Sequence, residues 1–381
     1  MGETQLKMTD MGVAEMRGQQ RRCLSRDQGR DCFKHCFRHS LQRAVIALLL
    51  MTSPLLAENS PLSRHEFVQI RMGVPVRIVV YASDPVSAIQ ATDAAYERLK
   101  QLDRTLSDYD PDSELNQLCL APTGTAVKVS PDLWSVLSAS QKLSAQSDGA
   151  FDVTVGPLVK LWRVARRKKQ LPDPADLAAA KKRVGFQHVT LDTAQQTVTL
   201  SLPEMQLDVG GIAKGYAADA AYNVLVEHGL PIALLAVAGD IRVGDPPPGR
   251  TGWRVEVEDR GRAAPPDHKP LVLELCRQAV STSGDTYQYL QLNGVRYSHI
   301  VDSKTGLGLT TPGSVTVVAP TCMQADGLAT ALSILGPDRG FAFLEQFPHT
   351  HAMFVALNEQ SEPVVRTSPD WNTVPTVKPA N

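Results

Sequence analysis

The sequence predicts an α+β fold, in which strands and helices mix without a strict β-α-β alternation. Of the 381 residues, 43% are apolar and 21% are charged, so the chain can form a packed core. Gly and Pro occur 26 times each, which indicates many turns and disfavours an all-helical protein. Stretches with the two-residue period of strands also follow stretches with the helical period along the chain.

The first regular elements are predicted by clear local signals. Apolar and polar residues alternate over 66–81, so we expect a hairpin with its bend at 73–75. A helical pattern opens at 83–85 and runs to about Leu106. Its apolar face comprises Ala88, Ala91, Ala95, Leu99, Leu102 and Leu106. Ser130 is a typical cap for another helix, with Pro131 at the first helical position.

Further elements follow from the same patterns. Strands are expected at 197–202, 232–257, 271–283 and 314–319. Helices are expected from about Gly211 and over 324–335, the latter ended by Gly336 and Pro337.

The amino terminus has the pattern of a secretory signal. Residues 1–43 carry nine Lys and Arg against five Asp and Glu, and the apolar run 44–57 follows directly. This run is shorter than the roughly 20 residues needed to span a bilayer. We expect cleavage near Ala57; an uncleaved anchor and a cytosolic protein are the alternatives, and an internal Met could be the true start.

The chain is therefore divided into a leader over 1–57, a linker over 58–65, one catalytic domain over 66–360 and a tail over 361–381. The net charge of −1 gives no reason to expect a nucleic-acid-binding protein. Of the six cysteines, only Cys119, Cys276 and Cys322 lie after the leader. They are too few and too widely spaced to form a disulfide framework.

The first segment whose residues are suited to binding or catalysis is 207–219. An apolar run ends at Asp208, two glycines follow, and a helix begins with Lys214 in its first turn. Free N–H groups at a helix amino terminus favour anions, and the Lys adds a point charge. A phosphate site and an ordinary glycine turn with a surface Lys both fit this segment, which matches neither a Walker A loop nor a dinucleotide fingerprint.

Two further segments place polar groups together. Asp326 and Thr330 lie four residues apart on one helical face and offer hard oxygen ligands for Mg²⁺; a solvated Asp beside a packed Thr is the alternative. His299 and Asp302 precede a Gly turn, where a His near a carboxylate can act as a general base or can simply cap the turn. Met72, Tyr109 and Phe151 could contact a flat heterocycle or could be ordinary packing.

In this order the segments resemble the ApbE family, the FAD:protein FMN transferases. The resemblance runs from about Met72 to Leu335. It rests on the segments 107–116, 151–157 with Leu161 and Trp162, 208–219, 238–240, 281–285, 299–306 and 326–330.

The resemblance implies an activity and a fold. The family binds FAD with Mg²⁺ on its pyrophosphate; a Thr or Ser hydroxyl of a target protein attacks the FMN-side phosphorus, AMP leaves, and FMN stays attached through a phosphoester. It also implies a T-fold-like single catalytic unit. FAD is then a substrate, and Mg²⁺ is the cofactor.

The resemblance also assigns residues. Gly211, Asp326 and Thr330 match the metal ligands, and we expect the Asp326 side chain to face a cleft. His299 matches the residue suited to deprotonate the target hydroxyl, with Asp302 beside it. The flavin-nucleotide contacts are matched by Met72, Tyr109, Ala150, Phe151, Asp152, Asp208, Lys214 and Val301.

Two departures from the family pattern stand out. Ala238 replaces the first Gly of the usual Gly-Gly-Asp, and Ser303 replaces a Pro, which we expect to loosen that turn slightly.

The resemblance further implies an exported, periplasmic enzyme, with membrane contact only through an uncleaved leader. Its expected partners are FAD and an acceptor protein with a Thr or Ser flavinylation site, such as a subunit of a membrane redox pump. Two other functions stay open: an FAD pyrophosphatase that yields FMN and AMP, and a flavin-binding module without catalysis.

Overall fold

The computed structural model describes residues 61–257, 270–284, 289–311, 313–358, 360 and 362–377. All described residues lie in one compact unit, Asn59–Asn381. The expected leader therefore lies outside the described residues. No helix among those described is long and apolar enough to cross a bilayer.

The central element is an antiparallel sheet of eight strands, and the order of the strands in the sheet differs from their order in the chain. Along the sheet the strands are β1 (Ser63–Arg71), β2 (Val74–Ala82), β6 (Ala233–Val237), β7 (Asp240–Val243), β10 (Ala279–Gly284), β13 (Gly313–Ala319), β14 (His351–Leu357) and β15 (Pro363–Thr367). Successive side chains of a strand point to opposite faces. On one face of β2 the side chains of Val76, Ile78, Val80 and Ala82 are buried, and on the other face Val79 is buried, so the sheet is covered on both sides at this point.

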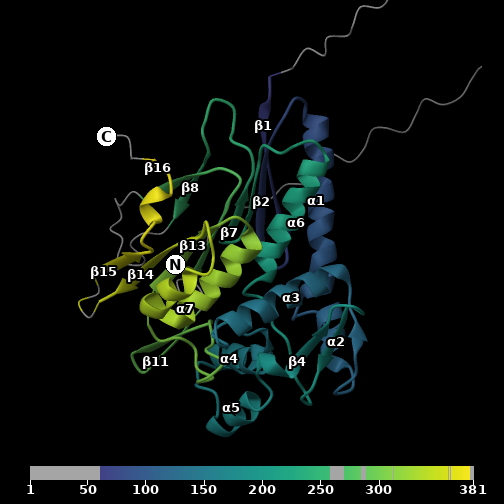
Figure 1. Cartoon of the computed structure of the whole chain (residues 1–381), viewed down its shortest axis with the longest axis vertical. Coiled ribbons are helices and arrows are strands. Elements are labelled where there is room, and N and C mark those ends of the chain that lie inside the picture. Colours follow the sequence, from purple (N-terminus) through teal and green to yellow (C-terminus); the bar gives the residue numbers. More distant parts are fainter. Residues whose placement is uncertain are drawn as a thin grey trace, which may run out of the picture. The chain divides into compact units, whose positions relative to one another are not determined.

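Helices cover one face (Figure 1). They are α1 (Pro85–Leu106), α3 (Pro131–Gln146), α6 (Ala213–Glu227) and α7 (Cys322–Leu344). Val76, Ile78 and Val80 of β2 belong to the core cluster that these helices form with the sheet. The helix α6 lies between α1 and α7 and contacts both, so the amino terminus of α6 is held against α7.

A small second sheet covers the other face. It consists of β8 (Trp253–Val257), β9 (Leu271–Leu275) and β16 (Thr376–Val377). Val79 and Leu234 of the large sheet pack here against Val255 and Leu273. This sheet gives the carboxy-terminal residues a structural role.

A third apolar cluster lies around Trp162, between α4 (Gly156–Lys168), α5 (Pro174–Lys181) and the hairpin of β11 (Tyr289–Leu292) and β12 (Val295–Ser298). The Trp162 Nε1 donates a hydrogen bond of 2.8 Å to the carbonyl oxygen of Gly306. The remaining elements are α2 (Glu114–Leu120), β3 (Val127–Lys128), β4 (Val189–Asp192), β5 (Thr197–Leu200) and the 3-10 turns Val153–Val155, Phe186–His188 and Trp371–Thr373.

The predicted α+β class is confirmed, and so are the elements with strong local signals. The apolar face predicted for the first helix is buried in α1, and the Asp84 side chain caps that helix. Ser130 caps α3 as expected. The helix predicted to end at Gly336 does break there, at φ 71° and ψ 173°, but a further helical segment continues to Leu344.

The expected domain boundaries differ from the structure at both ends. β1 begins at Ser63, inside the segment expected to be a linker. The expected tail contains β15, which pairs with β14, and β16, which pairs with β9. Because these strands complete two sheets, treating 361–381 as a tail was wrong for residues 363–367 and 376–377.

Candidate active site

Asp326 lies where α6 and α7 touch. Gly215 allows this approach, because a Cβ there would lie 2.2 Å from the carbonyl oxygen of Cys322. The Asp326 side chain is only 3% exposed, and its Oδ2 accepts a hydrogen bond of 3.0 Å from the N–H of Gly215. The first N–H groups of a helix have no partner inside it, so Asp326 satisfies one of them. The carboxylate is thus buried against α6, and the expectation that it faces an open cleft was wrong.

Lys214 joins Asp326 to a second buried carboxylate. Its Nζ lies 3.4 Å from Asp326 Oδ2 and 3.2 Å from Asp240 Oδ2. The same ammonium donates to the carbonyl oxygen of Gly210 at 2.9 Å. Asp240 begins β7 and also accepts a hydrogen bond from the hydroxyl of Ser281. One cation therefore faces two buried carboxylates.

The shared burial of these groups changes their pKa values. Burial and the charge of Asp240 raise the pKa of Asp326 to about 7, although Lys214 and the Gly215 N–H oppose the shift. Burial lowers the pKa of Lys214, but the charges of Asp240 and Asp326 outweigh it, so the net shift is upward. Lys214 therefore stays charged, and Asp326 holds a proton more tightly than an ordinary carboxyl group does.

The three expected metal ligands meet at this junction. Thr330 lies one helical turn after Asp326, and its Oγ1 is 3.5 Å from the carbonyl oxygen of Gly211. A Cβ on Gly211 would lie 2.9 Å from that Oγ1, so only Gly fits without a shift. Carboxylate, hydroxyl and carbonyl oxygens suit Mg²⁺, which also keeps water or phosphate oxygens.

The donor set leaves room for such additional ligands. Within the part of the chain that the structure describes, no three His, Cys, Asp or Glu side chains form a metal-binding group. An ion at this junction would therefore depend on the three oxygens named above and on oxygens of a bound ligand. The residues fit a Mg²⁺ ion of that kind.

Arg163 of α4 joins a second set of expected site residues. Its Nη1 lies 2.5 Å from Asp108 Oδ2, and its Nη2 lies 3.0 Å from Asp208 Oδ2. Its guanidinium carbon is 4.1 Å from the ring centroid of Tyr109. Asp208 continues toward the metal-ligand group, because its Oδ1 accepts a hydrogen bond of 2.8 Å from the Gly210 N–H. Burial and the charge of Asp108 raise the pKa of Asp208, and Arg163 opposes this.

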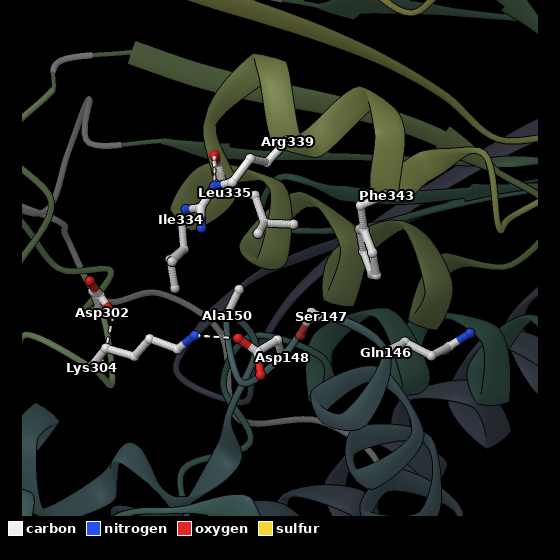
Figure 2. Close-up of a pocket in the computed structure, with 10 residues that line it drawn as sticks. All are labelled: Gln146, Ser147, Asp148, Ala150, Asp302, Lys304, Ile334, Leu335, Arg339 and Phe343. Atoms are coloured by element: carbon white, nitrogen blue, oxygen red, sulfur yellow. Dashed lines mark hydrogen bonds and ion pairs between the residues drawn. The ribbon is translucent and has the colours of Figure 1, made fainter.

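A pocket of ≈ 240 Å³ brings together Ala150 and Asp302 (Figure 2). The loop 146–150 and the turn around Lys304 form part of its wall, and α7 contributes Ile334, Leu335, Arg339 and Phe343. Ile334 lies one helical turn beyond Thr330, so α7 connects the pocket with the α6–α7 junction.

Two contacts hold the turn to the loop at this pocket. The Ser303 hydroxyl donates a hydrogen bond of 2.9 Å to the carbonyl oxygen of Gly149. Lys304 Nζ lies 2.6 Å from Asp148 Oδ2, as Figure 2 shows. Ser303 stands where the family resemblance predicts Pro, and its hydrogen bond compensates for the loosening that we expected.

The two expected catalytic residues lie in the same segment. The Asp302 carboxylate accepts hydrogen bonds from the Lys304 N–H at 2.8 Å and from the Thr305 hydroxyl at 3.2 Å. It therefore supports its own turn. His299 directly follows β12 and is half-buried. Hydrogen bonds between Leu309 and the residues on either side of His299 fix the backbone there.

The other expected flavin contacts are more buried than a ring-stacking role requires. Phe151 is 3% exposed and belongs to the main core, so its aromatic face is not open to a ligand. Asp152 accepts hydrogen bonds from the N–H and hydroxyl of Thr154 and from the Phe186 N–H. Val301 is buried and bridges to Gly308, and Met72 lies in the β1–β2 turn at φ 51°, packed against the core.

The structure adds two residues that the sequence reasoning did not assign to the site. Asp240 lies in the family segment 238–240, but its pairing with Lys214 depends on a sheet strand meeting a helix. Arg163 has its two carboxylate partners 55 and 45 residues away in the sequence. The local spacing of residues does not indicate such contacts. Only the positions of Asp108 and Asp208 in expected site segments could have indicated that a cation lies nearby.

The sequence of this chain is similar to those of known proteins. The sequence model of the ApbE family matches residues 72–354. The FAD:protein FMN transferase of Treponema pallidum is 34% identical over 309 residues, which cover 77% of this chain and 84% of that protein. The FAD:protein FMN transferase of Vibrio cholerae is 33% identical over 252 residues, which cover 65% and 74%.

Solved structures are similar as well. The flavin transferase ApbE from Vibrio cholerae has a TM-score of 0.73 at 28% identity, covering 82% of this chain and 100% of that one. The apo form of the Pseudomonas stutzeri flavinyl transferase ApbE has a TM-score of 0.73 at 29% identity, covering 82% and 97%. This chain therefore belongs to the ApbE family.

Proposed function

We propose that this chain is an FAD:protein FMN transferase, as its curated relatives are named. It joins the FMN part of FAD to a Thr or Ser hydroxyl of an acceptor protein and releases AMP. The observation that carries the proposal is the meeting of Lys214, Asp326, Thr330 and the Gly211 carbonyl at the α6–α7 junction. A cation, a carboxylate and neutral oxygens in one place are suited to binding a metal-complexed pyrophosphate.

Asp326, Thr330 and the Gly211 carbonyl are the residues that would hold Mg²⁺. A bound Mg²⁺ neutralises charge on the pyrophosphate and on the departing AMP. Lys214 supports the same charge balance, because its ammonium is held in place by Asp240 and the Gly210 carbonyl. Asp240 therefore acts by positioning Lys214.

The transfer step requires a base. The acceptor oxygen forms a bond to the FMN phosphorus, the bond from that phosphorus to the bridging oxygen breaks, and AMP carries the bridging oxygen away. The acceptor's proton passes to His299, whose backbone is fixed between β12 and Leu309. Asp302 keeps the following turn in shape through its hydrogen bonds to Lys304 and Thr305.

The dinucleotide extends from the junction to the other matched positions. Tyr109 offers an exposed ring, and Ala150 offers part of the pocket wall. Met72 lies in the β1–β2 turn, which precedes all the other matched positions in the chain.

The enzyme acts outside the cytoplasm, either free in the periplasm or tethered to the inner membrane. The basic segment 1–43 and the apolar run 44–57 support export. Amino-terminal sequencing of the protein recovered from a periplasmic extract tests this, and a mature protein that still begins at Met1 in the cytosolic fraction would contradict it.

Mass spectrometry tests the reaction. A candidate acceptor protein is incubated with FAD, MgCl₂ and this protein, and the expected result is a mass increase equal to FMN on one Thr or Ser, together with AMP. Rapid AMP release without any acceptor would instead indicate a pyrophosphatase, and FAD recovered intact would indicate a binding protein. His299→Ala should lower the rate of transfer more than the affinity for FAD, with His228→Ala, an exposed position, as the control.

A further inference from the structure

The side chain of Arg163 is placed to organise the part of the site that lies next to the metal-ligand group. It connects the loop 107–113 with the segment 208–211 through two carboxylates, Asp108 and Asp208. The side chains of this triad are 20%, 14% and 11% exposed in the order Arg163, Asp108 and Asp208. The triad is therefore shielded enough for its geometry to persist in solution.

The ring of Tyr109 completes this group. The Arg163 guanidinium stacks on one face of the ring at 4.1 Å, while Tyr109 as a whole remains 76% exposed. The other face of the ring is therefore open to solvent. A stacked cation fixes the plane of the ring, so the open face is held ready for stacking at low entropic cost.

The backbone of the loop does not need Arg163 for its shape. The Ser107 hydroxyl accepts from the N–H groups of Tyr109 and Asp110, and the Ser107 carbonyl accepts from the Ser113 hydroxyl. On the other side, the Trp162–Gly306 hydrogen bond anchors α4 next to Arg163. Arg163 thus controls the orientation of the Tyr109 ring and the charge of the two carboxylates, and not the folding of the loop.

We propose that Arg163 is a positioning residue for FAD: it holds the Tyr109 ring to stack against one of the flat rings of the dinucleotide and offsets part of the negative charge of Asp108 and Asp208 beside the pyrophosphate. This inference rests on the proposed function. Its chemical logic is electrostatic as well as steric, because two uncompensated carboxylates would repel a dinucleotide whose phosphates are anionic. Lys cannot replace Arg here, since it lacks the planar fork that pairs with two partners and stacks.

The test measures FAD binding and turnover separately in the full-length protein. Equilibrium dialysis with FAD and MgCl₂, without acceptor, gives the dissociation constant, and initial rates with an acceptor protein give kcat and KM for FAD. Arg163→Ala should weaken FAD binding and raise KM roughly tenfold, while kcat at saturating FAD changes by less than about twofold. Arg163→Lys should give an intermediate loss.

A double-mutant cycle separates positioning from general stability. Tyr109→Leu at its exposed position should weaken FAD binding less than Arg163→Ala, which also leaves two carboxylates unpaired, and the double variant should be hardly weaker than Arg163→Ala alone. Arg167→Ala removes an exposed Arg from the same helix and should leave binding unchanged.

Each other outcome overturns the proposal. Unchanged FAD affinity in Arg163→Ala, wild-type affinity in Arg163→Lys, or fully multiplicative losses in the double variant would each show that Arg163 does not act through Tyr109. A collapse of kcat at unchanged affinity would assign Arg163 to the chemical step instead. If Arg163→Ala does not fold, Arg163→Lys and Tyr109→Leu still decide the question. Failure of the wild-type protein to bind FAD would overturn the proposed function along with this inference, whereas the variant results overturn only the inference.

Discussion

The α6–α7 junction and the 299–306 turn each contain a carboxylate that the sequence assigns to chemistry, but they use it in different ways. Asp326 is 2% exposed and faces the ammonium of Lys214 and the carboxylate of Asp240, which come from separate segments of the chain. Asp302 accepts hydrogen bonds from residues two and three positions later. A charge buried by distant segments marks a site that can bind or react, whereas a charge satisfied by its own turn mainly supports the backbone.

The largest expected effect is at the junction. Asp326→Asn keeps an oxygen that can accept from the Gly215 N–H but removes the charge that a metal ion requires. We expect transfer to fall by about 10²–10³-fold with little change in fold. The rate of AMP release over a MgCl₂ titration is the measurement.

Asp338→Asn is the matched control for this variant. Asp338 lies on the same helix, but its side chain is 85% exposed and pairs with Arg366 at the surface. Equal activity of the two variants would show that the α6–α7 junction is structural and not the metal site.

The next largest effect is expected for the ammonium group of Lys214. Lys214→Met leaves Asp240 and Asp326 buried without a positive partner, which should lower the free energy of unfolding by about 3 kcal/mol at pH 8. Asp326 has a folded pKa of about 7, above its ordinary value of 3.8, so its contribution to stability falls as the pH rises through this range. The difference between variant and parent should therefore be smaller at pH 5.

Urea unfolding at the two pH values measures this difference. Lys182→Met, at an exposed position, is the control and should change stability little. A Lys214 variant as stable as the parent at pH 8 would mean that the two carboxylates do not depend on the ammonium.

Substitution in the 299–306 turn should have a weaker effect than substitution at the α6–α7 junction. Asp302→Ala removes two hydrogen-bond acceptor contacts and should lower the free energy of unfolding by about 1 kcal/mol. Because Asp302 acts through the turn, we expect transfer to fall by less than about tenfold. A fall as large as that of Asp326→Asn would remove the distinction between the two regions and make Asp302 a catalytic residue.

Local signals in the sequence predicted much of the fold. Ser130 caps a helix as expected, and the first helix begins at Pro85 within the predicted start 83–85, because helix starts depend on residues within one turn. The strand β16 was missed because two residues carry no periodic signal, and its pairing with β9 joins segments about a hundred residues apart. The segment of α7 beyond Gly336 was missed because Gly and Pro together are a strong stop signal.

In the site, too, local spacing predicted some features, whereas others depend on the tertiary fold. The spacing of Asp326 and Thr330 placed them on one face of a helix, and that placement is seen in α7. The burial of Asp326 could not be read from the spacing, since it depends on the contact of Gly215 with α7. Asp240 and Arg163 acquire their roles only from partners brought close by the tertiary fold.

The smallest expected effect concerns the hairpin that carries Asp240 into the junction. The turn between β6 and β7 has two residues, and only the first, Ala238, has a positive φ, at 53°. Glycine is favoured at that position of a hairpin turn because it has no Cβ. Ala238 is exposed, so Ala238→Gly loses no packing and should raise the free energy of unfolding by about 0.5–1 kcal/mol. Thermal unfolding measures this gain, and Ala194→Gly, at an exposed turn position whose own φ is not positive, should give none. A destabilised Ala238 variant would mean that the turn tolerates its Ala without strain, and that Asp240 is positioned by the sheet alone.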